Sequence, residues 1–133
     1  MTPGRPRALL DTHLLLWAAD DSPRQPARVA ALIAGGENDL LFSAASIWEV
    51  AIKATLGRSD FHADPLALRG GLLAAGWMEL PVTGAHAAAV VALPRLHGDP
   101  FDRLMVAQAR VEGLPFVTAD RPLGAYGPPV EVA

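Results

Sequence analysis

The sequence predicts an α/β domain with a mainly parallel sheet and helices on both faces. Short apolar runs alternate along the chain with longer segments whose apolar residues recur at helical spacing. Runs this short are typical of strands buried on both faces, and their alternation with helices favours parallel pairing. Because crossovers between parallel strands are right-handed, the helices are expected to cover both faces of the sheet.

Length and composition limit the class of protein. The 133 residues are expected to form one domain, 1–133, in which residues 1–6 are a loose N-terminal tail. The chain has no Cys, which excludes disulfides, thiolate zinc sites and a Cys nucleophile. No apolar run approaches the roughly 20 residues of a membrane span, and the N-terminus does not resemble a signal peptide. We therefore expect a cytoplasmic protein that does not contact the membrane.

In the first half of the chain, capping residues and glycines delimit the elements. Asp11 ends the first apolar run, Gly35-Gly36 ends the second helical pattern, and Ser43 is a helix cap. Gly57 ends the helix that Ser43 begins. The expected elements are a strand over 8–10, a helix over 12–19, a helix over 25–34, a strand over 40–42 and a helix from 43 to about 56.

The second half uses the same signals. Asp64-Pro65 and Asp99-Pro100 each combine a helix cap with a proline at the first helical position. Gly76 and Gly113 end the two helices that follow. The expected elements are a helix over 65–75, a strand over 77–82, a helix over 83–93, a helix over 100–112, a strand over 116–118, a turn over 120–127 and a short strand near 130.

The helix after Asp99 carries a second carboxylate in its first turn. Because Asp99 is the cap and Pro100 the first helical residue, Asp102 is the third. One interpretation is a capping box, in which the Asp102 carboxylate accepts a hydrogen bond from the backbone N–H of the cap. The other interpretation depends on where the remaining acids of the chain lie.

Four acids are expected at one edge of the sheet. Asp11 directly follows the first strand, Asp120 follows the fourth, and Asp102 opens the helix that leads into the fourth. Glu49 lies farther along its helix, roughly 9 Å beyond the cap at about 1.5 Å per residue. Its longer side chain leans back toward the helix N-terminus and can reach the same place. Ligands of such sheets bind at the carboxyl ends of the strands.

Each acid also has a purely structural interpretation. Asp11 can cap the helix that follows it, and Asp120 can cap a turn. Glu49 stands four residues before Lys53, the favourable order for a surface ion pair, although its apolar neighbours leave little room for a solvated face. Four unrelated structural roles for acids that all lie at one edge of the sheet are a less economical explanation than one shared site.

A cluster of carboxylates indicates a metal site. Close carboxylates repel one another and are costly unless a cation holds them. Oxygen ligands favour Mg²⁺ or Mn²⁺ over zinc, and the four His, at 13, 62, 86 and 97, have no metal-ligand spacing. Mg²⁺ held by carboxylates usually acts on phosphates. The net charge of −3 argues mildly against a general nucleic-acid binder, but bound cations would make the site less negative than this total suggests.

Four segments are informative together, and they follow in order along nearly the whole chain: 11–13 (Asp-Thr-His), 43–53 (with Trp48-Glu49), 97–103 (with Asp-Pro-Phe-Asp-Arg) and 118–120 (Thr-Ala-Asp). These segments resemble the PIN-domain ribonucleases, and among these the VapC toxins of bacterial type II toxin–antitoxin pairs. The resemblance implies a PIN-like three-layer fold with a parallel five-stranded sheet. It also implies a Mg²⁺- or Mn²⁺-dependent endoribonuclease, a homodimer, and a cognate VapB-like antitoxin that lays a peptide across the acidic groove.

The resemblance implies a role for each matching residue. Those expected to be catalytic and to bind the metal are Asp11, Glu49, Asp102 and Asp120, with Asp99 as a further metal-binding acid at the rim. Thr12 and Thr118 are expected to orient carboxylates or water. Lys53 is the chain's one Lys, so RNA would be held by Lys53, Arg103 and Arg121, with Arg58 and Arg95 as further candidates. Single-stranded or loop RNA is the expected substrate, because its splayed bases can be read.

Three other functions remain open. A non-catalytic PIN-like module could bind RNA or a protein without cutting. A receiver-type phosphoacceptor domain has a similar size and an acidic Mg²⁺ pocket, but it normally needs a Lys near its last strand, and this chain has none after Lys53. A phosphatase of the haloacid-dehalogenase type would need a second Asp two residues after the first, where His13 stands.

Overall fold

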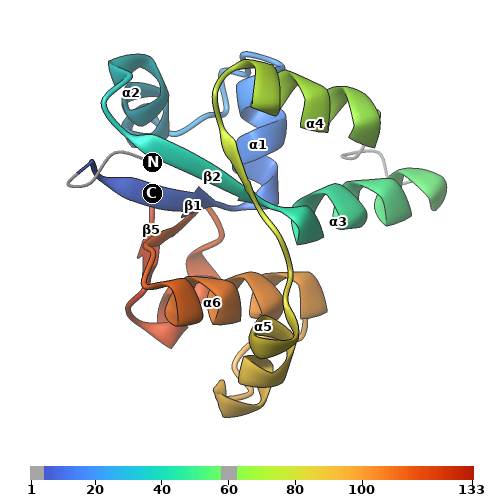
Figure 1. The fold of residues 1–133 in the computed structure, drawn as a ribbon, viewed down its shortest axis with the longest axis vertical. Helices are drawn as coiled ribbons and strands as arrows, with labels where there is room; N and C mark the ends of the chain where they lie inside the picture. The colour runs from blue at the N-terminus through green and yellow to red at the C-terminus, as the bar shows by residue number, and fades with distance from the viewer. Residues whose placement is uncertain (1–4, 58–62) are drawn as a thin grey trace.

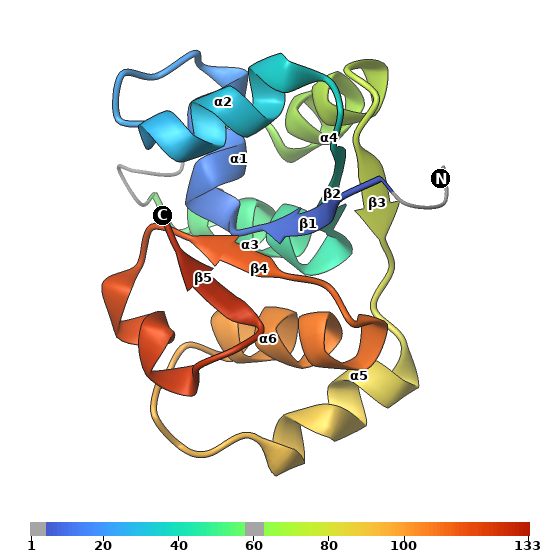
Figure 2. The same cartoon turned by 90° about the vertical axis from the view of Figure 1, so that its left-hand side faces the viewer.

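The computed structural model describes residues 5–57 and 63–133, which form a five-stranded, all-parallel sheet between two layers of helices. The strand order is β3-β2-β1-β4-β5, so β1 is the central strand (Figures 1 and 2). The strands are β1 (Arg7–Leu10), β2 (Asp39–Ser43), β3 (Met78–Leu80), β4 (Phe116–Thr118) and β5 (Val130–Val132). The helices are α1 (Thr12–Ala19), α2 (Ala27–Gly35), α3 (Ala44–Thr55), α4 (Pro65–Ala74), α5 (Gly84–Ala89) and α6 (Pro100–Glu112), with 3₁₀ turns η1 (Val90–Ala92) and η2 (Arg121–Tyr126).

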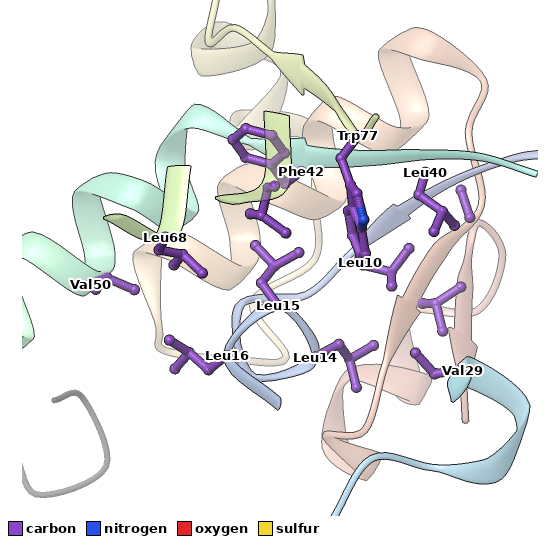
Figure 3. Close-up of a cluster of buried hydrophobic side chains, with 13 residues drawn as sticks. Leu10, Leu14, Leu15, Leu16, Val29, Leu40, Phe42, Val50, Leu68 and Trp77 are labelled. Atoms are coloured by element: carbon purple, nitrogen blue, oxygen red, sulfur yellow. The ribbon is translucent and has the colours of Figure 1, made fainter. Parts of the chain in front are cut away.

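Each face of the sheet has its own core. Side chains alternate along a strand, so Leu10 faces the layer of α1, α2 and α4, whereas its neighbour Leu9 faces α6. On the first side Leu15, Phe42 and Trp77 pack around Leu10 (Figure 3). The second core gathers buried side chains of α6, β4 and η2 with Leu9. The two layers are visible above and below the sheet in Figure 2. The prediction of helices on both faces is therefore confirmed.

Each predicted helix and strand is present, but several of them begin or end at other residues than the sequence predicted. The α2 helix begins at Ala27 rather than Gln25, because Pro26 disfavours helical geometry at the residue before it. The β3 strand is limited to Met78–Leu80, since Pro81 lacks an N–H for the ladder. The helix predicted over 83–93 ends as α5 and tightens into η1 before Pro94. The turn predicted over 120–127 contains the 3₁₀ segment η2.

The start of the described chain contacts the sheet. Arg5, which we expected in the loose tail, donates from Nε to Asp39 Oδ1 (2.9 Å) and from a terminal nitrogen to the Gly36 carbonyl (3.1 Å). The Pro6 carbonyl accepts from the Asp39 N–H (2.8 Å). Residues 1–4 of the predicted tail lie outside the described part. Among the helices of the described residues, none has the length and apolar character that a membrane crossing requires.

Gln108, fully buried on α6, ties that helix to the edge of the sheet. Its Oε1 accepts a hydrogen bond from Ser43 Oγ at the end of β2 (2.5 Å), and its Nε2 donates to the Pro81 carbonyl (3.3 Å). Ser43 is also the cap of α3, accepting from the Ala45 N–H (3.0 Å). This network fixes the start of α3 relative to α6, the two helices that carry Glu49 and Asp102.

We predict that Gln108→Leu destabilises the protein by about 1–3 kcal/mol, because it nearly keeps the side-chain volume but leaves the buried Ser43 hydroxyl and the Pro81 carbonyl without their partner. Urea unfolding of both proteins measures this difference. Arg110→Gln, an exposed substitution on the same helix, should stay within about 0.5 kcal/mol of the parent. A Gln108→Leu protein as stable as the parent would show that the network contributes nothing.

Candidate metal centre

Asp11 is buried at the carboxyl end of the central strand and is held by two threonines. Its Oδ1 accepts from the backbone N–H of Thr12 (2.7 Å), and its Oδ2 accepts from Thr118 Oγ1 (2.6 Å). Its own N–H donates to the Val117 carbonyl (3.0 Å), which continues the pairing of β1 with β4 beyond the last strand residue. Asp11 is therefore the cap of α1, as the structural interpretation expected, and it also faces the edge where the other acids lie.

Glu49 reaches back along α3 to the same edge. Its side chain is 4% exposed, its Oε1 accepts from Thr12 Oγ1 (2.6 Å), and its Oε2 accepts from Lys53 Nζ (2.6 Å). The ion pair between Glu49 and Lys53 is thus present, but it is not on a solvated helix face. Thr12 contacts both Asp11, through its backbone, and Glu49, through its hydroxyl.

Asp99 and Asp102 open α6 with different contacts. Asp99 Oδ1 accepts from the N–H groups of Phe101 (2.8 Å) and Asp102 (3.2 Å), which confirms Asp99 as the cap. Asp102 does not form the capping box, because its Oδ2 instead lies 2.9 Å from His97 Nε2. Its carboxylate is directed toward the edge of the sheet and not toward the backbone of the cap.

Asp120 completes the edge from the far side of β4. Its N–H donates to Thr118 Oγ1 (3.0 Å), the same hydroxyl that donates to Asp11. Its Oδ2 lies 3.8 Å from His97 Nε2. His97, Asp102 and Asp120 each offer one potential ligand atom, and these three atoms lie within 4.8 Å of one another. These three side chains therefore form the tightest group of potential metal ligands in the described part of the chain.

The charges of these acids act on one another. Burial raises the pKa of Asp102 to about 8, together with the negative charges of Asp11, Asp99, Glu49 and Asp120. All four of these acids therefore lie close enough to Asp102 for their charges to act on it, including those outside the tight group. Burial and the anionic neighbours together disfavour the ionised form of Asp102, so a cation bound beside this carboxyl would stabilise its charge.

Asp11 also resists ionisation. Burial raises the pKa of Asp11, and the charge of Glu49 raises it further, while the hydrogen bonds from Thr118 and Thr12 and the nearby His13 act in the opposite direction. The two threonines thus stabilise a charged carboxylate in a place where burial disfavours one. This is the contact pattern expected of side chains that orient acids.

Lys53 supplies positive charge at one end of the cluster. Burial disfavours its charged form, but the hydrogen bond and charge of Glu49, with the charges of Asp99 and Asp102, raise the pKa of Lys53 overall. Its Nζ lies 3.7 Å from Asp99 Oδ2. Lys53 is therefore an internal counter-ion of Glu49 and Asp99, a contact that its predicted role in RNA binding did not include.

Arg103 and Arg121 differ in their surroundings. The Arg103 guanidinium donates to the carbonyls of Pro94 (2.9 Å) and Val90 (3.4 Å) and to Tyr126 Oη (3.0 Å), so it fastens the segment before α6 to the protein. These contacts are structural and leave RNA binding by Arg103 a prediction. Arg121 is exposed and follows Asp120 directly. Arg95 is exposed as well, and Arg58 lies outside the described residues.

His97 is the site residue that sequence reasoning missed. It was set aside because none of the four His has a ligand-type spacing to another His. The signal that could have found it is its position two residues before the Asp99 cap, in the segment that delivers Asp102 to the edge. The resulting donor set, carboxylate oxygens with one imidazole nitrogen, suits a hard or borderline divalent cation.

Comparison with solved structures finds the same fold in proteins described as parts of toxin–antitoxin systems or as a toxin. The VapBC2 complex of Rickettsia felis bound to promoter DNA matches with a TM-score of 0.68 at 14% identity, covering 96% of this chain and 97% of that one. A toxin–antitoxin complex from Klebsiella pneumoniae gives 0.65 at 18% identity, over 94% and 96%. Mycobacterium tuberculosis VapC20, described as a toxin that cleaves the sarcin–ricin loop, gives 0.65 at 15% identity, over 90% and 95%. At these identities the likeness establishes the fold.

A family model, and not a single relative, establishes the family of this chain. A search of curated proteins finds no match to it. The family model described as the PIN domain matches residues 8–127, a segment that runs from β1 through η2 and includes every acid at the edge of the sheet. The chain therefore belongs to the PIN domain family.

Proposed function

We propose that this protein is a VapC-type toxin, a Mg²⁺- or Mn²⁺-dependent endoribonuclease that hydrolyses RNA phosphodiesters and is neutralised by a cognate antitoxin. The observation that carries the proposal is the crowding of acids around the buried carboxyl of Asp102: burial, together with these negative charges, raises the pKa of Asp102 to about 8. Binding a divalent cation relieves such repulsion. The family and the toxins that share the fold support the same reading.

In this proposal Asp11, Glu49, Asp102 and Asp120 hold the metal, and Asp99 adds negative charge at the rim. A metal ion bound by carboxylates supplies an activated water for in-line attack and stabilises the leaving oxygen. Thr118 orients Asp11 and holds the backbone of Asp120, while Thr12 orients Glu49. Every side chain needed at the site thus comes from a residue at or just beyond the carboxyl end of a strand, or from a helix that begins there.

The RNA strand would be held by cations beside these acids. Arg121 is exposed next to Asp120 and is available to a phosphate, and Lys53 lies at the opposite end, beside Glu49 and Asp99. Arg103 supports the segment that carries His97 and is a weaker candidate for direct contact. Single-stranded or loop RNA remains the proposed substrate. The further proposals are a homodimer, a VapB-like antitoxin as partner, and a cytoplasmic location.

Two of the alternative functions have specific tests. A receiver-type domain of the CheY kind has strand order 2-1-3-4-5, whereas this sheet has order β3-β2-β1-β4-β5, which argues against that alternative. A non-catalytic PIN-like binder would keep the fold without cleaving RNA, so an activity measurement separates it from the nuclease.

We predict that the purified protein cleaves structured RNA with Mg²⁺ or Mn²⁺ and not with EDTA, and that Asp102→Asn lowers the cleavage rate by ~100-fold or more. Loss of residues that merely support a metal ligand already costs about 10–100-fold, and Asp102 is proposed as a ligand. Gel analysis of labelled RNA measures the rate. Asp64→Asn is the matched control, an Asp at the cap of α4 that lies outside the site, and it should cleave like the parent. Cleavage that survives EDTA or Asp102→Asn would refute the proposal.

We predict that Asp102→Asn stabilises the metal-free protein at pH 8 by about 0.5–2 kcal/mol, in the range seen when a strained site is relieved. Because the pKa of Asp102 is raised in the folded state, the fold binds this proton more tightly than the unfolded chain does. The stability that the protonated Asp102 carboxyl contributes to the folded protein is therefore complete below about pH 4 and is lost as the pH rises toward 8. Asn has no proton to lose.

Thermal unfolding in EDTA from pH 4 to 8 measures this effect. The advantage of Asp102→Asn should shrink toward pH 4, and saturating Mg²⁺ should stabilise the parent more than the variant. A variant that is less stable than the parent at pH 8 in EDTA would mean that the carboxylate contributes a favourable structural contact and is not strained by its neighbours.

A further inference from the structure

His97 projects into the acidic edge from a segment that belongs to no helix or strand. Its side chain is 19% exposed, and its Nε2 lies 2.9 Å from Asp102 Oδ2 and 3.8 Å from Asp120 Oδ2. The same ring nitrogen therefore faces two carboxylates that come from opposite sides of the site, one from α6 and one from the segment between β4 and η2.

The spacing of these three donor atoms suits ligands of one ion. Two ligands bound at about 2.1 Å and at right angles to each other lie about 3 Å apart, and wider angles give larger separations. The distances of 2.9 Å and 3.8 Å from His97 Nε2 agree with this requirement, and all three atoms lie within 4.8 Å of one another. These separations therefore allow one ion to contact the imidazole together with the carboxylates of Asp102 and Asp120.

The segment that carries His97 is held in place before any ion binds. Arg103, one residue after Asp102, donates to the Pro94 carbonyl (2.9 Å), and the Leu96 N–H donates to the same carbonyl (2.9 Å). Asp99 then caps α6 two residues after His97. Anchors on both sides of the histidine fix its position relative to Asp102, so the imidazole needs little rearrangement to act as a ligand.

We propose that His97 Nε2 is a direct ligand of the metal ion, next to Asp102 and Asp120, and that it makes the site prefer Mn²⁺ over Mg²⁺. This inference rests on the proposed function, since it assumes that the acids hold a divalent ion. Mg²⁺ strongly prefers oxygen ligands, whereas an imidazole nitrogen suits the transition metals. The nitrogen thus sets the choice of metal at a site whose carboxylates alone would accept either ion.

The competing role for His97 is to orient Asp102 by a hydrogen bond without touching the ion, as groups behind metal ligands often do. His97→Gln separates the two roles. The glutamine amide can still donate a hydrogen bond near the position of Nε2, but it has no imidazole nitrogen. His13→Gln is the matched control, because among the described residues His13 is a second histidine near the acids, and its charge acts on Asp11.

The decisive experiment is pulsed electron paramagnetic resonance of the full chain loaded with Mn²⁺, together with calorimetric titrations of Mn²⁺ and Mg²⁺. We expect an imidazole ¹⁴N modulation in the parent and in His13→Gln that is absent from His97→Gln. We also expect His97→Gln to weaken Mn²⁺ binding about tenfold or more and Mg²⁺ binding by clearly less.

Each outcome decides between the proposals. Bound Mn²⁺ without a ¹⁴N modulation in the parent would overturn His97 as a ligand and leave the carboxylate site standing. A modulation that persists in His97→Gln, or disappears in His13→Gln, would also overturn it. If the parent binds neither ion, the failure is that of the proposed metal-dependent function itself. A parent that binds Mn²⁺ without this modulation overturns the proposal even if a variant folds poorly.

Discussion

The site is governed by the repulsion between carboxylates that the fold forces together. Parallel strands end at one edge, so the residues that follow β1 and β4 and the helices that begin near that edge direct their side chains into the same space. The chain compensates for this repulsion only in part. Hydroxyls of Thr12 and Thr118 donate to Glu49 and Asp11, and Lys53 neutralises Glu49, yet Asp102 remains surrounded by negative charge.

The internal contacts divide the acids into two parts. Glu49 and Asp99 share the ammonium group of Lys53, whereas Asp102 and Asp120 both lie beside the imidazole of His97. Glu49 and Asp99 already have the positive charge of Lys53 beside them, so a bound cation would offset more repulsion beside Asp102 and Asp120. This difference places the strongest demand for a cation beside Asp102 and Asp120, on the side of the site where Arg121 lies exposed. A phosphate group drawn to Arg121 would meet the ion there.

The sequence predicted those parts of the site that depend on element order, and it missed those that depend on loop paths. Asp11 and Asp120 follow short apolar strands, so their meeting could be derived from the rules of parallel sheets. Glu49 could be placed from helix geometry and the length of its side chain. His97 could be placed only in the segment that leads to Asp102, because nothing in a lone histidine between helices fixes where its ring points. The anchoring of that segment by Arg103 to the Pro94 carbonyl appears only in three dimensions.

The fold shows the same division. Apolar runs and caps located every strand and helix, while prolines moved or shortened the ends, as Pro26 and Pro81 do at α2 and β3. Lys53 illustrates a different limit. Its spacing from Glu49 predicted an ion pair, but only the burial of Glu49 turns that pair into part of the site.

Crystals grown with Mn²⁺ and measured at a wavelength where manganese scatters anomalously would show whether these carboxylates converge on a divalent ion. We expect an anomalous peak in contact with Asp102 and Asp120, on the side of the site that faces Asp11. A well-ordered site with no peak there, or Mn²⁺ bound only elsewhere on the protein, would contradict this expectation.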